Sequence, residues 1–204
     1  MTIWAIVPVK PLRLGKSRLS GVLSDEERAV LNRMFLEQTL DILRTTSAVT
    51  QTLVVSRDPS ALAIAREFGA RTVLEDGTPN LNGALTRATM LARNYASGVL
   101  VLPADLPTLT QADLLDFFEH VYEPPCMVIT PDRHLDGTNA LLMAPGGLVP
   151  YDFGPGSFTR HCERAKSAGA RLEIVRNDRI ELDLDTPADL AVLKKVENPK
   201  LEGE

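Results

Sequence analysis

Two short acidic segments have the residue types and the spacing to bind a metal ion. Asp105 lies in Pro-Ala-Asp-Leu-Pro, just after the apolar run 99–102, and Asp183 and Asp185 follow the run 179–182. A strand that ends in a carboxylate presents it at the carboxyl edge of a sheet, where open α/β folds bind ligands. The period of two in Asp-x-Asp puts both carboxylates on one face of an extended segment. Three converging carboxylates would suit Mg²⁺, which prefers hard oxygen ligands.

The same acidic segments also fit turn and helix-cap chemistry. Aspartate before proline is common at turns, and Thr186 followed by Pro187 has the pattern of a helix N-cap with proline at the first helical position. Each segment alone leaves the two interpretations equally open. A basic segment near the start of the chain favours metal binding when the three segments are taken together.

That basic segment follows the first predicted strand and carries four cations, Lys10, Arg13, Lys16 and Arg18. Lysine neutralises phosphate charge and the forked arginine guanidinium binds phosphate oxygens in pairs, so this density suits a triphosphate. Neither Gly-x₄-Gly-Lys-Ser/Thr nor Gly-x-Gly-x-x-Gly is present, which excludes a P-loop and a Rossmann fingerprint. Most such clusters are solvated loops. The position after the first strand favours phosphate binding here.

Further residues could bind the second substrate. The segment from Gly154 to Ser157 precedes a predicted helix, and free N–H groups at a helix start, with a serine hydroxyl beside them, can bind an anion. On its own, that segment is better explained as an ordinary serine N-cap. Thr138, at a predicted strand start, offers a hydroxyl or is merely a β-former. Asn82 either caps a helix or reads a base edge with its amide. We expect His161 on a helix surface.

Composition and charge describe an ordinary globular protein. The chain has 204 residues, 44% hydrophobic and 24% charged, enough for one α/β domain. A net charge of −5 argues against nucleic acid as the main partner. No apolar run approaches the ~18 residues of a membrane span. The start lacks the basic region of a signal peptide, and Cys126 and Cys162 lack metal-ligand spacing, so we expect reduced thiols and a cytoplasmic protein.

Strands alternate with helices, which predicts one α/β domain over residues 1–197 with a polar tail at 198–204. Strands are predicted at 2–9, 52–56, 71–75, 99–102, 127–130, 140–143, 171–175 and 180–184. Helices are predicted at 24–45, 58–68, 81–96, 110–122, 158–168 and 187–196. The first helix opens with a capping box, Ser24 to Glu27. We expect a largely parallel sheet with helices on both sides.

Six segments, taken in order, carry a family resemblance. They are Pro-Val-Lys…Lys-Ser-Arg-Leu at 8–19, Leu-Asn-x-Ala at 81–84, Asp-Leu-Pro at 105–107, Gly-Thr-Asn-Ala-Leu at 137–141, Phe-Gly-Pro-x-Ser-x-x-Arg-His at 153–161 and Asp-x-Asp-Thr-Pro at 183–187. Together they resemble the CofC/FbiD guanylyltransferases of coenzyme F-420 biosynthesis. The acidic motifs alone fit the wider MobA-like nucleotidyltransferases, and the Gly-Thr-Asn and Phe-Gly-Pro-x-Ser motifs narrow the resemblance.

The resemblance implies a single nucleotidyltransferase domain of the glycosyltransferase-A type, with a Rossmann-like, mixed central sheet. It implies that Mg²⁺ is bound by Asp105, Asp183 and Asp185. The residues that match the nucleotide site are Lys10, Lys16, Arg18 and Asn82, with Lys16 and Arg18 also serving catalysis. The residues that match the acid-substrate site are Thr138, Gly154 and Ser157.

The implied reaction transfers GMP from GTP to a small phosphorylated acid and releases pyrophosphate. The acceptor is 2-phospho-L-lactate, phosphoenolpyruvate or 3-phospho-D-glycerate, and the sequence does not choose among them. The alternatives are a molybdenum-cofactor guanylyltransferase or a cytidylyltransferase of the same fold, and a non-catalytic nucleotide-binding module. The retained carboxylates and basic segment argue against the last. We expect no nucleic-acid or membrane partner; the oligomeric state is open, with a homodimer as one candidate.

Overall fold

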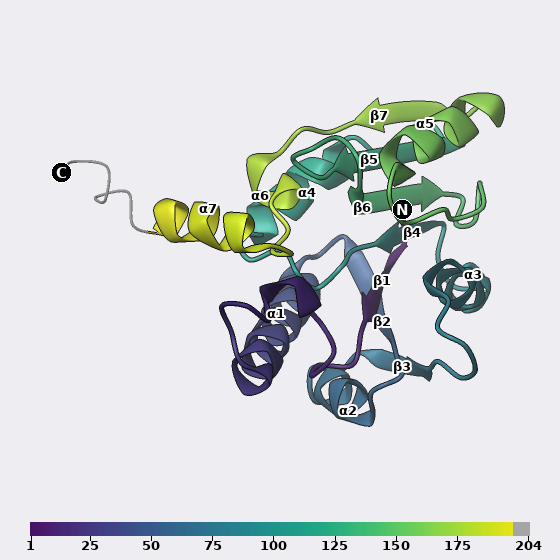
Figure 1. Cartoon of the computed structure of the whole chain (residues 1–204). Helices are drawn as coiled ribbons and strands as arrows, with labels where there is room; N and C mark the ends of the chain where they lie inside the picture. Colours follow the sequence, from purple (N-terminus) through teal and green to yellow (C-terminus); the bar gives the residue numbers. More distant parts are fainter. Residues whose placement is uncertain (198–204) are drawn as a thin grey trace.

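A seven-stranded sheet forms the centre of the computed structural model, which describes residues 1–197. Its strands are β1 (Ile3–Val9), β2 (Val49–Ser56), β3 (Arg71–Leu74), β4 (Gly98–Val101), β5 (Cys126–Pro131), β6 (Thr138–Ala144) and β7 (Arg171–Ile174). The strand order is β3-β2-β1-β4-β6-β5-β7 (Figure 1). β6 pairs antiparallel with β4 and β5, whereas the other neighbours are parallel. The predicted mixed, mostly parallel sheet is confirmed, and the predicted tail at 198–204 lies outside the described residues.

Helices connect the strands. They are α1 (Asp25–Thr45), α2 (Pro59–Glu67), α3 (Leu81–Ala92), α4 (Gln111–Glu119), α5 (Ser157–Ser167), α6 (Asp178–Glu181) and α7 (Pro187–Glu197), with a 3₁₀ turn, η1, at Ser17–Leu19. The predicted capping box is present at α1, because the Ser24 hydroxyl accepts from the Glu27 N–H and the Glu27 carboxylate accepts from the Ser24 N–H. Within residues 1–197, no helix has the length and apolar character needed to cross a membrane.

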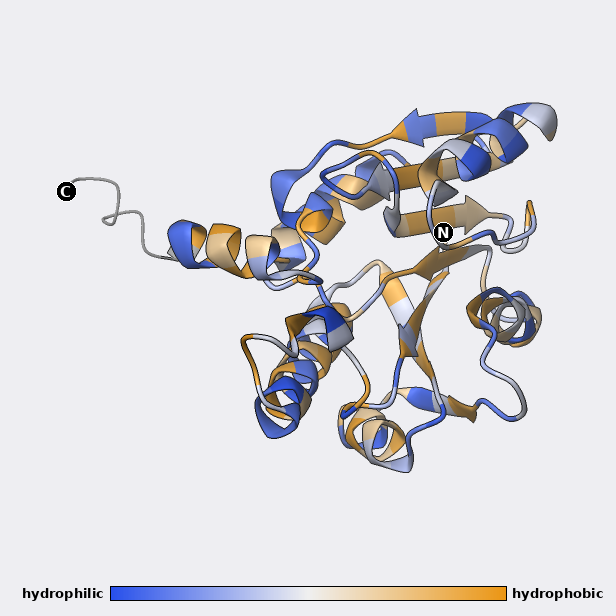
Figure 2. Cartoon of the chain, viewed as in Figure 1, coloured by the Kyte–Doolittle hydropathy of each residue, from blue (hydrophilic) through white to orange (hydrophobic). Residues whose placement is uncertain are grey.

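The sheet is covered on both faces because each strand sends alternate side chains to opposite sides. In β1, Ile3, Ala5 and Val7 join a buried cluster with residues of α1, α2 and α4. Trp4 and Ile6 join a second cluster with residues of α3 and α5. Figure 2 shows the apolar strands between helices whose polar residues face outward. The predicted placement of helices on both sides is confirmed.

A third, smaller apolar cluster joins the two ends of the chain. It consists of Leu19 of η1, Phe35 of α1, Leu184, and Leu193 of α7, all at most 7% exposed. Burying these side chains packs the segment that precedes α7 against the loop that follows β1. This cluster therefore places the segment that carries Asp183 and Asp185 beside the loop that carries Lys16 and Arg18.

The strand predicted at 180–184 is wrong. The Asn177 side chain accepts hydrogen bonds from the N–H groups of Arg179 and Ile180 and so starts the short helix α6. The chain then becomes extended without joining the sheet, whose edge beside β5 is already occupied by β7. A backbone hydrogen bond of 3.1 Å from the Leu184 N–H to the Asp105 carbonyl fixes it instead.

The period of two nevertheless holds in this extended segment. Leu182 and Leu184 are buried, at 3% and 0% exposed, whereas Asp183 and Asp185 are partly exposed. The two carboxylates therefore lie on one side, as predicted, although no strand carries them.

Candidate active site

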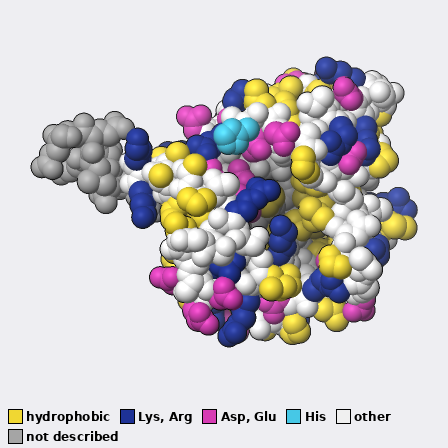
Figure 3. Space-filling view, viewed as in Figure 1, with side chains coloured by type: hydrophobic (Ala, Val, Ile, Leu, Met, Phe, Trp, Pro, Cys, Tyr) yellow, Lys and Arg dark blue, Asp and Glu magenta, His cyan; other side chains and the backbone are white. Residues whose placement is uncertain are grey.

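The ammonium group of Lys16 lies between two of the predicted carboxylates. Its Nζ is 3.2 Å from Oδ2 of Asp105 and 3.8 Å from Oδ1 of Asp185. The Lys16 side chain is only 4% exposed, so these carboxylates replace the water that the cation has lost. Arg18 lies at the rim, with its side chain 74% exposed and Nη1 3.8 Å from Oδ2 of Asp185. On the face drawn in Figure 3, lysine and arginine side chains lie along a central hollow.

Asp183 completes this group, which we call the charged cluster: Lys16, Arg18, Asp105, Asp183 and Asp185. Its Oδ1 accepts a 3.2 Å hydrogen bond from Nδ2 of Asn139. Burial raises the pKa of Asp183 to about 6, and the carboxylates of Asp105 and Asp185 add to the effect, while the Asn139 amide opposes it. The three carboxylates therefore repel one another, and negative charge collects where they meet.

These carboxylates have the donor chemistry that Mg²⁺ prefers. Throughout residues 1–197, however, no group of three His, Cys, Asp or Glu side chains is arranged to hold a metal ion as it stands. The Lys16 ammonium compensates part of the negative charge instead. Magnesium binding thus stays a prediction for which the ligand atoms are suitable.

The loop that carries Lys16 is fixed to α1. Nδ2 of Asn32 donates to the Leu12 carbonyl at 2.7 Å, and Nη1 of Arg28 donates to the Gly15 carbonyl at 3.4 Å. A Cβ at Gly15 would lie 2.6 Å from the Asn32 amide nitrogen, so a side chain there would displace the amide that holds the loop. Lys16 itself has a φ of 56°, in the left-handed region. Non-glycine residues adopt this region at a cost of about 1–2 kcal/mol, and such residues cluster at functional sites.

The interpretation of this segment as a solvated loop is therefore wrong for Lys16, although Lys10, Arg13 and Arg18 are exposed.

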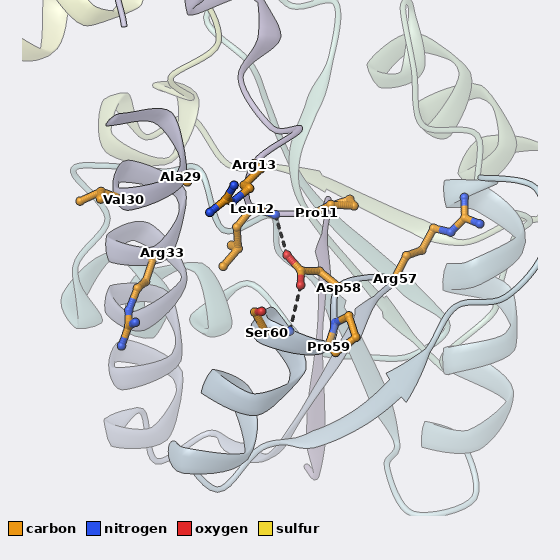
Figure 4. Close-up of a pocket in the computed structure, with 10 residues that line it drawn as sticks. All are labelled: Pro11, Leu12, Arg13, Ala29, Val30, Arg33, Arg57, Asp58, Pro59 and Ser60. Atoms are coloured by element: carbon orange, nitrogen blue, oxygen red, sulfur yellow. Dashed lines mark hydrogen bonds between the residues drawn. The ribbon is translucent and has the colours of Figure 1, made fainter. Parts of the chain in front are cut away.

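An open pocket of about 440 Å³ lies on the α2 side of the loop, lined in part by Arg13, Arg33 and Arg57 (Figure 4). Sequence reasoning missed it, because it is formed by residues far apart in the chain. Asp58 joins its walls by accepting from the N–H groups of Leu12, at 2.9 Å, and Ser60, at 2.8 Å.

A second group of side chains is buried and holds no formal charge; we call Thr138, Ser157 and His161 the hydroxyl cluster. Oγ1 of Thr138 is 3.1 Å from Oγ of Ser157 and 3.1 Å from Nδ1 of His161. The exposed fractions are 6%, 1% and 0%, respectively. The expected surface position of His161 is therefore wrong. The serine N-cap interpretation is also wrong, because Gly156 precedes the helix and Ser157 is its first residue.

Three of the N–H groups at the start of α5 are already bonded within the chain. The Gly156 N–H donates to Oδ1 of Asp136 at 3.0 Å, and the Phe158 N–H donates to the Asp136 carbonyl at 3.1 Å. The Ser157 N–H donates to the Gly154 carbonyl at 3.0 Å. The expectation that these groups are free for an anion is wrong, because the loop between β5 and β6 brings Asp136 to the helix start. The donors that this end of α5 still offers are the hydroxyl groups and the N–H of Thr159, which has no hydrogen-bond partner among the described residues.

Gly154 and Asn82 shape the loop before α5. Gly154 has a φ of 127°, which L side chains rarely adopt, and nothing lies within 4 Å of the place of a Cβ. The amide of Asn82 donates to the Phe153 carbonyl at 3.2 Å and accepts from the Phe153 N–H at 2.7 Å. Asn80, not Asn82, caps α3, by accepting from the Gly83 N–H. The cap interpretation of Asn82 is wrong, and its contact with the nucleotide stays a prediction.

Consecutive residues at the start of β6 connect the two clusters. Thr138 belongs to the hydroxyl cluster, whereas the Asn139 side chain donates to Asp183 and to the carbonyls of Ile180 and Glu181. The hydroxyl of Thr138 thus lies one residue along the backbone from Asn139, which donates a hydrogen bond to Asp183 of the charged cluster. Sequence reasoning assigned no role to Asn139, although it lies inside the Gly-Thr-Asn motif.

Comparison with known proteins identifies the family. The family described as "Guanylyl transferase CofC like" matches residues 3–195. The chain belongs to this family. A phosphoenolpyruvate guanylyltransferase of Rubrobacter xylanophilus is 42% identical over 195 residues, covering 95% of this chain and 94% of the relative. One of Sphaerobacter thermophilus is 36% identical over 193 residues, covering 95% and 93%.

Solved structures show the fold of this CofC-like protein. A nucleotidyl transferase from Methanothermobacter superposes with a TM-score of 0.70 at 16% identity, covering 95% of this chain and 96% of that one. The predicted nucleotidyltransferase fold and the family resemblance are both confirmed. The chain is accordingly a guanylyl transferase family member whose two clusters lie side by side across the start of β6.

Proposed function

We propose that this CofC-like protein transfers GMP from GTP to phosphoenolpyruvate and releases pyrophosphate, as a step of coenzyme F-420 biosynthesis. The names of relatives at 42% and 36% identity support both the reaction and the acceptor. The observation that carries the proposal is the connection at Thr138 and Asn139, which brings a charged cluster suited to a triphosphate next to a hydroxyl cluster suited to a small acid.

The reaction needs little acid–base chemistry. An oxygen of the acceptor phosphate attacks the α-phosphorus of GTP, a new P–O bond forms, and the bond to the β-phosphate oxygen breaks as pyrophosphate leaves. The attacking oxygen is anionic near neutral pH, so no general base is required. The buried His161 fits that view, because burial lowers its pKa to about 4 and its ring nitrogens are both engaged. Catalysis then rests on positioning and charge neutralisation.

Each cluster supplies one part of this work. Lys16 and Arg18, with Lys10 nearby in the chain, neutralise the triphosphate and the departing pyrophosphate. Asp105, Asp183 and Asp185 would hold Mg²⁺, which would supply charge neutralisation at the reacting phosphates. The hydroxyls of Thr138 and Ser157 bind the acceptor, and the loop at Gly154 supports them.

Pyrophosphate release by the full chain tests the proposal. The assay supplies Mg²⁺ with GTP, ATP or CTP, and offers phosphoenolpyruvate, 2-phospho-L-lactate and 3-phospho-D-glycerate separately and as a mixture. We expect release with GTP and phosphoenolpyruvate, and a mixed-acceptor product whose mass is that of the phosphoenolpyruvate adduct. A dominant adduct of another acid would overturn the acceptor assignment, and release with no acceptor of the panel would overturn the reaction.

Two further assignments need their own measurements. Contact of Asn82 with the guanine base predicts that Asn82→Ala lowers the preference for GTP over ATP. A homodimer predicts twice the chain mass by light scattering at micromolar concentration.

A further inference from the structure

His161 is held between two hydrogen-bonding partners that together determine where its proton lies. Its Nε2 accepts from the backbone N–H of Asp152 at 3.0 Å. A backbone N–H can only donate, so Nε2 must carry the lone pair and, in the neutral ring, Nδ1 must carry the proton. Nδ1 lies 3.1 Å from Oγ1 of Thr138 and therefore donates to it.

This tautomer decides how many hydroxyl protons remain for a ligand. Thr138 and Ser157 have one hydroxyl proton each, and their mutual contact of 3.1 Å uses one of the two. Because His161 donates to Thr138, the second hydroxyl proton has no partner inside the cluster. With the opposite tautomer, Nδ1 would accept from Thr138 and Thr138 would accept from Ser157, and both protons would be consumed.

The segment that fixes the tautomer is itself fixed. The Asp152 carboxylate forms ion pairs with Arg160, where Nε and Oδ2 are 3.0 Å apart, and with Arg164. Arg160 also donates to the Asp152 carbonyl at 3.0 Å, and Arg164 donates to the Pro150 carbonyl at 2.8 Å. The Phe153 ring packs edge-on against the His161 ring, with centroids 5.0 Å apart. The Asp152 N–H is therefore held in place as a donor to the histidine.

We infer that His161 is a positioning residue that keeps one hydroxyl proton of the Thr138–Ser157 pair directed out of the cluster, where it donates to an anionic oxygen of the phosphorylated acid. The inference rests on the proposed acceptor position at these two hydroxyls. It agrees with the start of α5, where the N–H groups of Gly156, Ser157 and Phe158 are already used by Asp136 and Gly154. A hydroxyl proton, beside the unbonded Thr159 N–H, is then a donor that remains for an incoming anion.

The tautomer can be measured on the wild-type protein. Long-range ¹H–¹⁵N correlation spectra at neutral pH give separate nitrogen shifts for Nδ1 and Nε2. We expect the protonated-nitrogen shift at Nδ1 of His161, before and after addition of phosphoenolpyruvate. The proton on Nε2 would overturn the inference, whatever the variants below do.

Matched substitutions then test the consequence for the acceptor. In His161→Asn the amide lies near the position of Nδ1 and can still donate to Thr138, whereas in His161→Gln it lies near Nε2 and cannot. We expect the KM for phosphoenolpyruvate to rise about tenfold in His161→Gln and at most about threefold in His161→Asn, with the KM for GTP unchanged in both. His120→Gln, which replaces a partly exposed histidine at the end of α4, is the control and should change neither KM.

Ser157→Ala separates failure of this inference from failure of the proposed function. If Ser157→Ala raises the acceptor KM but His161→Gln does not, the acceptor site stands and the positioning role falls. If the double variant Thr138→Val/Ser157→Ala, which removes both hydroxyls, also leaves the acceptor KM unchanged, the acceptor lies elsewhere and both conclusions fall. Equal increases of both KM values in His161→Gln would show a merely structural role and would also overturn the inference.

Discussion

The charged cluster and the hydroxyl cluster differ in how their polar groups are buried, charged and hydrogen-bonded. The charged cluster has side chains between 4% and 74% exposed, in three segments far apart in the chain, and its ion pairs are 3.2 to 3.8 Å long. The hydroxyl cluster is buried and neutral, with contacts of 3.0 to 3.1 Å at each nitrogen and oxygen. The charged cluster has three carboxylates and two cations, so it carries a net charge that a ligand can balance. In the hydroxyl cluster, every hydrogen-bonding group has a partner except one hydroxyl proton. We therefore expect ligands to rearrange the charged cluster more than the hydroxyl cluster.

The largest effect should come from removing charge in the charged cluster. Asp183→Asn and Asp185→Asn should each lower kcat by about 100-fold or more while the protein stays folded, because a neutral amide is a poor substitute for a carboxylate ligand of Mg²⁺. Pyrophosphate release measures the rate and circular dichroism the fold. Asp178→Asn, an exposed neighbour on α6, is the control. A near-normal rate in either variant would remove that residue from the metal site.

A change in the hydroxyl cluster should affect one substrate only. Ser157→Ala removes a hydrogen bond to a charged group, worth about 1.5–3 kcal/mol, so acceptor affinity should fall about ten- to a hundredfold. GTP binding, measured by calorimetry, should be unchanged, because the triphosphate is assigned to the other cluster. Ser167→Ala, at the exposed end of the same helix, is the control. Equal losses for GTP and acceptor would mean that the two clusters do not divide the substrates between them.

Within the charged cluster, the more buried cation should contribute more to GTP binding. Lys16→Ala should weaken GTP binding by about tenfold or more, and Arg18→Ala by less, because the Arg18 side chain is 74% exposed and its interactions are screened by water. GMP binding should change much less in both, since GMP lacks the β- and γ-phosphates. Arg44→Ala, at the far end of α1, is the control. If GMP were weakened as much as GTP, the loop would be holding the base, the ribose or the fold.

The smallest effect near neutral pH is on the free energy of unfolding, and it comes from His161 of the hydroxyl cluster. Burial lowers the pKa of His161 to about 4; Arg164 and Arg160 contribute, and Asp152 opposes them. The unfolded chain takes up a proton near the ordinary histidine pKa of about 6.5, whereas the folded protein resists it until about 4. Unfolding free energy should therefore fall as pH drops through this window, by up to roughly 3 kcal/mol.

Urea denaturation at several pH values between 4.5 and 7 measures this dependence. His161→Asn should lose the part of the slope that comes from the histidine, while other groups contribute equally to both proteins. Parallel curves for the wild type and the variant would mean that His161 takes up its proton without resistance, and the hydroxyl cluster would then be less enclosed than the structure shows.

Local patterns predicted much of this molecule from sequence. Apolar runs and capping signals located seven strands and the longer helices, and the carboxyl ends of strands placed Asp105 near the basic loop. The period of two correctly put Asp183 and Asp185 on one side even though the strand was wrong, because it depends on burying Leu182 and Leu184 rather than on a neighbouring strand.

The errors share a different cause. Asp136 reaches the start of α5 from 20 residues away, and His161 becomes buried because a loop and β6 close over it. Asn177 could cap a helix or end a strand, and only the completed sheet edge decides between them. Which partner satisfies a polar group is a property of the whole fold, so residue type and spacing cannot give it.

The small apolar cluster of Leu19, Phe35, Leu184 and Leu193 also has a consequence for a chain that is cut after β7. All seven strands end by residue 174, so such a truncated chain keeps every strand of the sheet. The loop that carries Lys16, by contrast, loses the Asp185 carboxylate and the apolar side chains of Leu184 and Leu193. We therefore expect a chain truncated after β7 to keep its sheet and to lose the position of Lys16 that the proposed nucleotide site needs.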